Sequence, residues 1–445
     1  MSRTRIIIIG AAGRDFHNFN TMYRGNADYE VVAFTATQIP DIADRRYPAE
    51  LAGELYPEGI PIHDMSELEA VIRSYKAEVC VFSYSDISYN DLMQIGTRVM
   101  VAGAHFMTPT PHAAYLESTK PVISVLAVRT GSGKSQTSRR VVEILKNDLG
   151  VTRVVSIRHP MPYGDLKKQA VQRFAKIQDL QDFECTIEEM EEYEPHIAAG
   201  NVIYAGVDYE RILRQAEAEA DVILWDGGNN DPSFIRSDLT IVVADPLRPG
   251  HELTYYSGET NITMADVVVL NKCDSAKPED IETVEHNIRS RNAKAQILRA
   301  DSPVTVDHPE LVTGKRVLVV EDGPTLTHGN MSIGAGYVAA KQLGASEIIR
   351  AKEFAVGSVR EAYDNYPQIT EVLPALGYFQ QQLDDLAQSI RNAKPDTVII
   401  GTPIDLRRVI KIECDSTRVQ YDLKEHDPGK LRDAIAGVLR KSQNT

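Results

Sequence analysis

Cysteine is scarce in this chain of 445 residues, and the four cysteines stand far apart without a CxxC pair. A zinc site or a disulfide framework is therefore not expected, whereas a reducing, cytoplasmic setting is. Long apolar runs are also missing. The isoleucines at residues 6–9 are too few for a signal-peptide core, and no stretch approaches the roughly 18 residues of a membrane span. We expect no membrane partner.

Basic residues are in the minority, with 48 Lys and Arg against 63 Asp and Glu and a formal charge of −15. An acidic chain that has no basic stripe or aromatic-rich motif gains little electrostatic binding energy from the phosphates of nucleic acid. Nucleic acid is therefore not an expected partner. The hydrophobic content of 43% and the charged content of 25% are those of an ordinary globular protein. The length suggests two or three domains.

Residues 121–140, PVISVLAVRTGSGKSQTSRR, organise the chain. A β-branched apolar run leads into a glycine turn and then into a polar, helix-compatible segment, which is the order of a phosphate-binding loop. Glycine lets the backbone wrap an anion, and the following helix N-terminus adds positive partial charge. We expect Lys134 to contact the β- and γ-phosphates and Ser135 to ligate Mg²⁺. The expected nucleotide-binding residues of this loop are Thr130, Gly131, Ser132, Gly133, Lys134, Ser135 and Gln136.

The loop departs from G-x-x-x-x-G-K-[ST] because Val128 stands where the first glycine belongs. Arg129 occupies the place where one large branch of P-loop NTPases carries an additional signature lysine. We therefore count Arg129 as catalytic, with a phosphate of its own site or of a neighbouring subunit in a homodimer as its target. The alternative is a glycine turn in an ordinary βα unit.

Two further motifs follow in the order of a nucleotide-binding domain. The segment DVILWDGGNN has the form of a Walker-B strand, so we expect Asp226 to hold Mg²⁺ and Gly227 and Gly228 to let the backbone approach the γ-phosphate. The second motif, NKCD, is the guanine-reading N-x-x-D type. Asp274 would accept hydrogen bonds from the base, Lys272 would pack along it, and Asn271 would brace the loop. The expected nucleotide is GTP or ATP.

Further polar side chains follow predicted strands. His159 is a catalytic candidate in the loop where NTPases place their first switch, and the substrate candidates are Arg158, Asp165, Arg248, His251, His328, Arg407 and Arg408. Each has a structural alternative, such as a proline-stiffened loop or a surface arginine pair. The loop around residues 321–336 is a second predicted anion cradle, rich in glycine, threonine and histidine. The acidic stretch at residues 186–197 is predicted to be mostly a solvated helix face.

The N-terminal region alternates strands at residues 5–9, 29–35 and 77–83 with helical patterns, as in a doubly wound domain. Its first turn does not complete G-x-G-x-x-G, so a nicotinamide cofactor is less expected than a phosphorylated metabolite. Arg14, His17 and Asn18 would contact such an anion. A purely structural turn is an equal alternative.

Taken whole, the sequence resembles a family of archaeal and bacterial P-loop proteins described as predicted GTPases or as cyclic 2,3-diphosphoglycerate synthetase-like. The resemblance spans nearly the full chain and rests on GAAGRDFHNFN, VRTGSGKSQTSR, RHPMPYGD, EYEPH, YAGVDYE, WDGGNND, DPLRPGHELTYY, NKCD, EDGPTLTHG and GTPIDLRR. It implies an NTP-dependent ligase that phosphorylates or activates a small phosphorylated or carboxylate substrate. NKCD departs from the ATP that such a synthetase uses. A regulatory or chaperone-type GTPase hydrolase acting on a protein partner is the alternative.

These features predict an α/β chain built around a P-loop NTPase domain with a mostly parallel, SIMIBI-like sheet. A Rossmann-like domain precedes it and a smaller α/β substrate-binding segment follows it. The predicted boundaries are residues 1–118, 119–305 and 306–445, with the first connection near residues 116–120.

Overall fold

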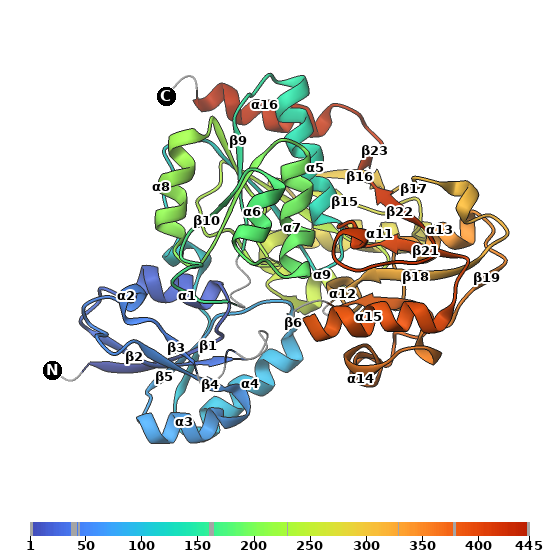
Figure 1. The fold of residues 1–445 in the computed structure, drawn as a ribbon. Helices are drawn as coiled ribbons and strands as arrows, with labels where there is room; N and C mark the ends of the chain where they lie inside the picture. The colour runs from blue at the N-terminus through green and yellow to red at the C-terminus, as the bar shows by residue number, and fades with distance from the viewer. Residues whose placement is uncertain are drawn as a thin grey trace.

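The computed structural model describes residues 3–36, 42, 45–159, 164–228, 230–327, 329–376 and 380–442. It is an α/β protein in which three sheets form three parts of the molecule (Figure 1). This confirms the predicted fold class. Among the described residues, no helix has the length and apolar character needed to cross a membrane.

The N-terminal part contains β1(Thr4–Ile9), α1(Arg14–Asn18), β2(Tyr29–Ala36), β3(Arg46–Tyr47), α2(Ala49–Ala52), β4(Ile60–Asp64), α3(Leu68–Tyr75), β5(Val79–Phe82), α4(Tyr89–Ala102) and β7(His105–Met107). Its sheet has the order β3-β4-β2-β1-β5-β7, and all neighbours except β3 and β4 are parallel. The strands predicted at residues 5–9, 29–35 and 77–83 are therefore present. Buried isoleucines of β1 pack on both faces of this sheet, as expected of a doubly wound unit.

Among the described residues, the sheet of the central part contains nine strands: β8(Val122–Ala127), β9(Val154–Ile157), β10(Gln172–Phe174), β11(Val202–Ala205), β12(Val222–Trp225), β13(Leu239–Ala244), β15(Val267–Leu270), β16(Gln296–Asp301) and β23(Lys424–Glu425). They lie in the order β10-β11-β9-β12-β8-β13-β15-β16-β23. The P-loop strand β8 is fully buried and lies next to the Walker-B strand β12. Antiparallel β10 and β23 close the two edges of an otherwise parallel sheet.

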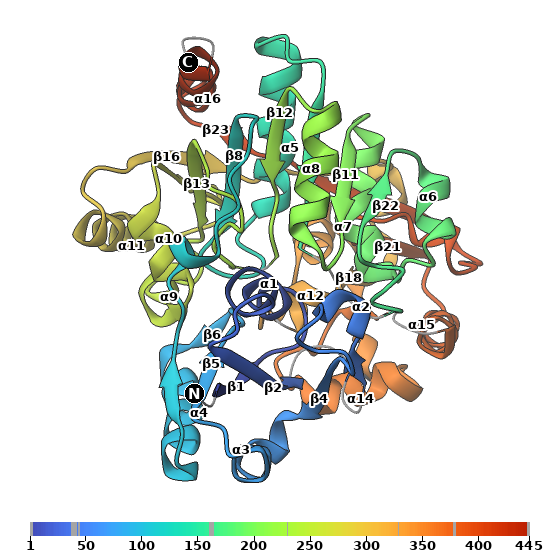
Figure 2. The ribbon, with the colours of Figure 1, turned by 90° about the vertical axis from the view of Figure 1, so that its left-hand side faces the viewer.

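Helices cover both faces of this sheet (Figure 2). They are α5(Lys134–Glu143), α6(Ile177–Asp182), α7(Ile187–Ala198), α8(Tyr209–Glu219), α9(His251–Thr254), α10(Gly258–Met264), α11(Pro278–Arg291) and α16(Lys430–Ser442). Helix α7 joins two cores, because Ile187 packs in the third part and Tyr193 packs against Phe174 of β10.

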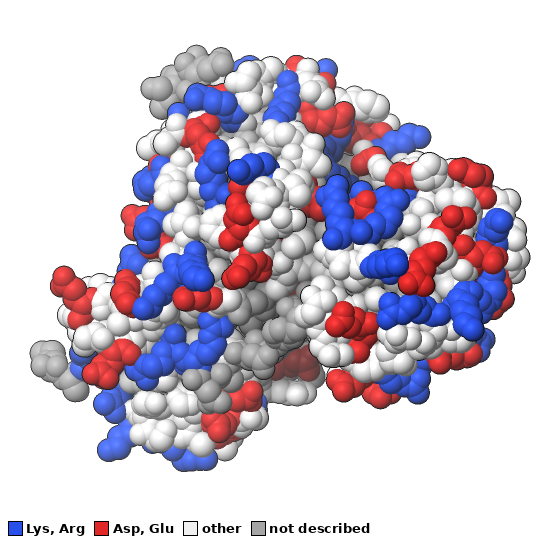
Figure 3. Space-filling model, viewed as in Figure 1, with Lys and Arg blue, Asp and Glu red and all other residues white. Residues whose placement is uncertain are grey.

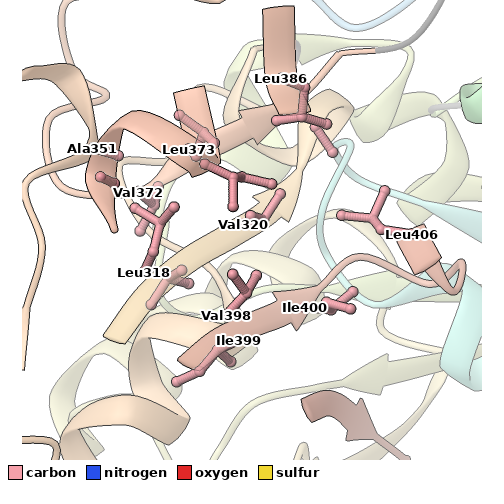
Figure 4. Packing of buried hydrophobic residues seen from close by; sticks show 14 of the residues in the cluster. Leu318, Val320, Ala351, Val372, Leu373, Leu386, Val398, Ile399, Ile400 and Leu406 are labelled. Atoms are coloured by element: carbon pink, nitrogen blue, oxygen red, sulfur yellow. The ribbon is translucent and has the colours of Figure 1, made fainter. Parts of the chain in front are cut away.

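The third part contains β17(Val304–Val306), β18(Arg316–Asp322), α12(Gly323–Leu326), α13(Ala335–Gln342), β19(Glu347–Ile348), α14(Gly357–Asn365), β20(Leu373–Ala375), α15(Gln380–Ala393), β21(Thr397–Gly401) and β22(Asp415–Tyr421). The sheet order is β17-β22-β21-β18-β19, with β20 paired to β18. Leu318 and Val320 of β18 pack with Val398 and Ile400 of β21 under α15 (Figure 4).

The end of the chain returns to the central part, which corrects the prediction that residues 306–445 form one segment. Strand β23 pairs with β16, and Leu431 and Ile435 of α16 belong to the core beneath the central sheet. The buried apolar residues of α16 recur at helical spacing and form one face of the helix. That face must pack against another apolar surface, and the central sheet provides it. A short antiparallel pair, β6(Ile87–Ser88) with β14(Tyr255–Tyr256), joins the N-terminal and central parts.

Leu318→Ala tests the core of the third part. The side chain is 0% exposed, so its loss should cost about 2–5 kcal/mol of local unfolding free energy, through lost apolar burial and a residual cavity. Hydrogen exchange of the β18 and β21 amides measures this. Val101→Ala is the control, because Val101 is 82% exposed and should change stability by less than about 0.5 kcal/mol. Unchanged exchange in Leu318→Ala would contradict the described packing.

Candidate active site

The P-loop begins where β8 ends and closes at Lys134, the first residue of α5. Gly131 and Gly133 have φ angles of 80° and 106°, the left-handed region that side chains rarely adopt. A Cβ on Gly133 would also collide with the amide of Asn271. The glycines of the turn are therefore required by the backbone path and by the close approach of a second loop.

The carboxylate of Asp226, at the end of β12, is the centre of the site. Lys134 Nζ donates to Asp226 Oδ1 at 2.9 Å, Ser138 also donates to Oδ1, and His196 Nε2 lies 2.8 Å from Oδ2. Burial by itself would raise the pKa of Asp226, but Lys134 and Arg158 outweigh it and hold that pKa far below its ordinary value. Asp226 is therefore ionised, and its charge orients α5 and α7 around it.

Arg158, directly after β9, is a second cation in this centre. Its Nη1 donates to the main-chain oxygen of Asp226 at 2.8 Å, and its Nη2 forms an ion pair with Glu192 of α7. Burial lowers the pKa of Lys134, and the charge of Arg158 lowers it further. Arg158 Nε is buried and has no hydrogen-bond partner among the described residues. The guanidinium therefore retains a free donor.

The NKCD loop braces the P-loop from the other side. Asn271 Nδ2 donates to the carbonyl of Ser132 at 3.0 Å, and Lys272 Nζ donates to the carbonyl of Gly131 at 2.6 Å. Asp274 is exposed, and its Oδ1 accepts the backbone N–H of Ser302 at 3.1 Å. The motif is thus assembled beside the phosphate loop, as expected of a nucleotide-binding domain. Its preference for guanine stays a prediction.

Arg129 faces the N-terminal part of the molecule. Its Nε donates to Asp86 Oδ1 at 2.5 Å, its Nη1 lies 3.0 Å from His251 Nδ1, and its guanidinium stacks 3.6 Å from the ring centroid of Tyr255. The residue is 3% exposed. The structure holds this side chain between two parts of one chain, so the proposed contact with a phosphate of another subunit would require these interactions to break.

A cavity of about 280 Å³ lies between the P-loop and the third part. Its lining includes cationic side chains, among them Lys134, Arg158 and Lys272. It also includes carboxyl groups, and these are Glu188, Glu191, Glu192, Glu321 and Asp322. Cationic and acidic groups therefore meet in one cavity, and Arg158 and Glu192 form an ion pair there. On the face that Figure 3 shows, Lys and Arg are interspersed with Asp and Glu.

The predicted Mg²⁺ ligands fit the ion by chemistry. Ser135 lines the cavity next to Lys134, and Asp226 lies at the end of the neighbouring strand, so a hydroxyl and a carboxylate of the kind that Mg²⁺ prefers adjoin the phosphate loop. Lys134, Ser138 and His196 already form hydrogen bonds with the carboxylate oxygens of Asp226. Asp226 would therefore contact the ion through a water molecule.

The second predicted anion cradle is filled by a side chain of the protein itself. The carboxyl group of Glu321, at the end of β18, accepts the N–H of Tyr337 at 2.8 Å, and a Cβ on Gly334 or Gly401 would collide with it. Burial raises the pKa of Glu321 to about 8, although hydrogen bonds from the backbone of Tyr337 and Gly336 lower it. The glycines of this loop therefore surround a carboxyl group of the chain.

Several predicted residues lie outside the cavity lining. His159 lies 3.2 Å from Asp231, beside Gly13 of the N-terminal turn, Asp165 is exposed, and Gly228 packs against His159. Arg248 binds Asp245 and the carbonyl of Thr130, so it supports the P-loop. Arg407 pairs with Asp405, and Arg408 pairs with Glu194. His328 lies outside the described residues.

The N-terminal turn packs against the central part. Arg14 Nε donates to Asp231 Oδ1 at 3.1 Å, His17 Nε2 lies 2.6 Å from the carbonyl of Ala114, and Asn18 donates to Ser83. All three predicted anion contacts are buried. These contacts support the alternative in which this turn is a structural connection and not an anion-binding site.

Helix α7 was wrongly predicted as a solvated face. Glu189, Glu191, Glu194 and His196 are buried, because the helix packs between two parts of the molecule. The apolar residues Ile187, Met190, Tyr193 and Ile197 alternate with the glutamates, a pattern that could have indicated two packed faces. Sequence reasoning missed Glu191, Glu192, His196 and Ser138 as site residues.

The whole chain has a clear relative. It is 56% identical over 433 residues to arginine synthetase ArcE from Thermococcus kodakarensis, and the match covers 97% of this chain and 96% of that protein. The chain belongs to the arginine synthetase ArcE family. Residues 209–299 match the CobW/HypB/UreG nucleotide-binding domain. The protein is an NTP-dependent enzyme of synthetase or kinase-like type.

Solved structures give more distant likenesses. LpxK from Aquifex aeolicus, in complex with ATP, has a TM-score of 0.45 and 12% identity over 83% of this chain and 99% of that one. The hydrogenase maturation factor HypB from Archaeoglobus fulgidus has a TM-score of 0.24 and 15% identity over 41% of this chain and 80% of that one. The P-loop part of the resemblance noted from the sequence is confirmed, and its diphosphoglycerate part stays a hypothesis.

Lys134→Ala should lower NTP turnover by at least about 100-fold, because it removes a buried cation placed for the transferred phosphoryl group. The fold should persist, since Ser138, His196 and Arg158 still form hydrogen bonds with the carboxylate of Asp226. Phosphate release and a melting curve measure the two effects. Lys294→Ala, an exposed lysine, is the control. Turnover retained in Lys134→Ala would remove Lys134 from this role.

Asp274→Asn should weaken GTP binding by about 10- to 100-fold and leave ATP binding nearly unchanged, because an amide cannot accept both N–H groups of guanine. Titration calorimetry with each nucleotide and Mg²⁺ measures the difference. Equal losses for both nucleotides would show that the contact of Asp274 with Ser302, and not base recognition, explains the residue.

Proposed function

We propose that this protein forms arginine, the product given in the name of its relative arginine synthetase ArcE, at the expense of a nucleoside triphosphate bound at the P-loop. The observation that carries the proposal is the presence of P-loop cations and several carboxyl groups in the lining of one cavity. Lys134 suits the triphosphate. The carboxyl groups suit a substrate or product with cationic nitrogen.

The chemistry follows from what a P-loop site can do. Such a site positions a γ-phosphoryl group for transfer to an oxygen. The carbon of the guanidino group carries no oxygen, so a precursor with a ureido group offers the oxygen that must be activated. A nitrogen donor then forms the new C–N bond while the C–O bond breaks and phosphate leaves with the electron pair. Lys134 and Arg158 would offset the charge of the transferred group. Ser135 and Asp226 would hold Mg²⁺, which would supply positive charge beside the phosphates.

A small phosphorylated acid, as in cyclic 2,3-diphosphoglycerate synthesis, is the second candidate substrate. Arg158 with its free Nε favours an anion near the P-loop. The carboxyl groups in the same lining favour a ligand with cationic nitrogen over a second polyanion. We therefore rank arginine formation first. The nucleotide is ATP or GTP, and a regulatory GTPase acting on a protein partner does not account for the carboxyl groups in this cavity.

Incubation with the ureido analogue of arginine, ammonium as nitrogen donor, Mg²⁺ and either ATP or GTP should yield arginine and phosphate in equal amounts. Amino-acid analysis and phosphate release measure the two products, and Lys134→Ala serves as the inactive control. A parallel reaction contains 2,3-diphosphoglycerate in place of the amino acid. Nucleotide turnover stimulated by the diphosphoglycerate, with no arginine formed, would reverse the ranking.

A further inference from the structure

Two carboxyl groups of the cavity lining, Glu191 and Asp322, lie near each other. Glu191 projects from α7 and is 5% exposed, and its Oε1 accepts the hydroxyl of Thr402 at 2.6 Å. Asp322 ends β18 and caps α12, where it accepts the backbone N–H of Thr325 at 3.1 Å. The two groups are close enough for the charge of Asp322 to raise the pKa of Glu191. Two neighbouring carboxyl groups can share one proton.

This pair lacks the cation that its neighbours have. Glu192, one residue away, pairs with Arg158, and Glu194 pairs with Arg408, both on the same helix. Within the described part of the chain, no lysine or arginine forms an ion pair with Glu191 or Asp322. Buried carboxylates are costly unless they are paired or protonated. Burial raises the pKa of Glu191, and the charge of Asp322 raises it further, which favours a proton on the Glu191 carboxyl group in place of a neighbouring cation.

The same cavity also contains donors without acceptors. Gln136 is buried and its Nε2 has no hydrogen-bond partner within the described residues, and the same holds for Nε of Arg158. Both residues line the P-loop side. The cavity lining thus offers unsatisfied N–H donors together with carboxyl acceptors, which an acidic cluster alone would not.

We propose that Glu191 and Asp322 bind the guanidino group of arginine, and hold the ureido group of its precursor at the same place. A guanidinium has five N–H donors in a planar fork and forms paired hydrogen bonds with carboxylates. It can therefore engage both carboxyl groups, whereas an ammonium ion presents a compact point charge. This proposal rests on the proposed function, because it names the residues that select the amino acid in that site.

The third carboxyl group in this region has a different environment. Glu321 accepts backbone N–H groups at the start of α13 and fills a space bounded by Gly334 and Gly401. Its lone pairs are therefore engaged by the main chain. Glu191 and Asp322 remain as the carboxyl groups that can turn their oxygens to a ligand.

The proposal has a measurable consequence in proton uptake and release. A guanidinium that binds between the two carboxyl groups displaces the proton on Glu191, so arginine binding should release protons near pH 7. Titration calorimetry of the full chain in two buffers with different ionisation enthalpies, such as phosphate and Tris, gives the number of protons released. Arginine is the probe, and guanidinium chloride and ammonium chloride serve as competitors at equal ionic strength.

Glu191→Gln and Asp322→Asn should each weaken arginine binding by about 10- to 100-fold and abolish the proton release, because one charged partner is lost. Asn can also cap a helix, so Asp322→Asn should leave the start of α12 intact. This variant keeps the test valid if Glu191→Gln lowers the melting temperature of the protein. Glu194→Gln is the matched control: it lies on the same helix, makes the same substitution and pairs with Arg408 outside the cavity lining. It should bind arginine as the wild type does.

The outcomes separate the two proposals. Arginine that is formed and bound without proton release, or with equal affinity in Glu191→Gln and Asp322→Asn, would overturn the subsite and leave the proposed function standing. No binding and no formation of arginine in the wild type would instead refute the proposed function. Competition by ammonium as strong as that by guanidinium would show a general cation site and also overturn the guanidino assignment.

Discussion

The carboxylate of Asp226 holds three segments of the chain at one point. Lys134 and Ser138 reach it from α5, Arg158 contacts it from the end of β9, and His196 reaches it from α7. A buried carboxylate is tolerated only when such partners compensate for lost hydration. Because α7 is fixed through His196, its glutamates are placed at the cavity. The position of these carboxyl groups therefore depends on the same charge that orders the phosphate loop.

The N-terminal part supports this centre from the opposite side. Asp86 accepts both the Nε of Arg129 and the backbone N–H of Thr130, so it holds the start of the P-loop. Arg14 pairs with Asp231, which follows the Walker-B strand. In a doubly wound domain the turn after the first strand is the usual ligand position. Here that turn makes a domain contact, and the N-terminal part supports the P-loop without contributing to the cavity lining among the described residues.

The sequence was sufficient for the parts of the fold that follow from local patterns. The parallel strands were predictable because runs such as residues 122–127 and 222–225 are apolar on both faces, and Lys134, Asp226 and Asn271 follow from motifs at strand ends. The position of α16 and the role of α7 were not predictable in this way. A glutamate-rich helix looks solvated until its partner is known, and the contact between Arg129 and Asp86 joins residues far apart in the sequence, so no local pattern indicates it.

Helix α7 brings two carboxyl groups to the cavity through adjacent residues. Successive side chains on a helix point about 100° apart, so Glu192 faces Arg158 while Glu191 faces Asp322. A phosphate bound by Arg158 competes with Glu192 for the same guanidinium. The charge of Glu192 then becomes less compensated beside Glu191, which strengthens the attraction of this region for a cation. The triphosphate and a guanidino ligand would therefore favour each other's binding, although they contact different residues.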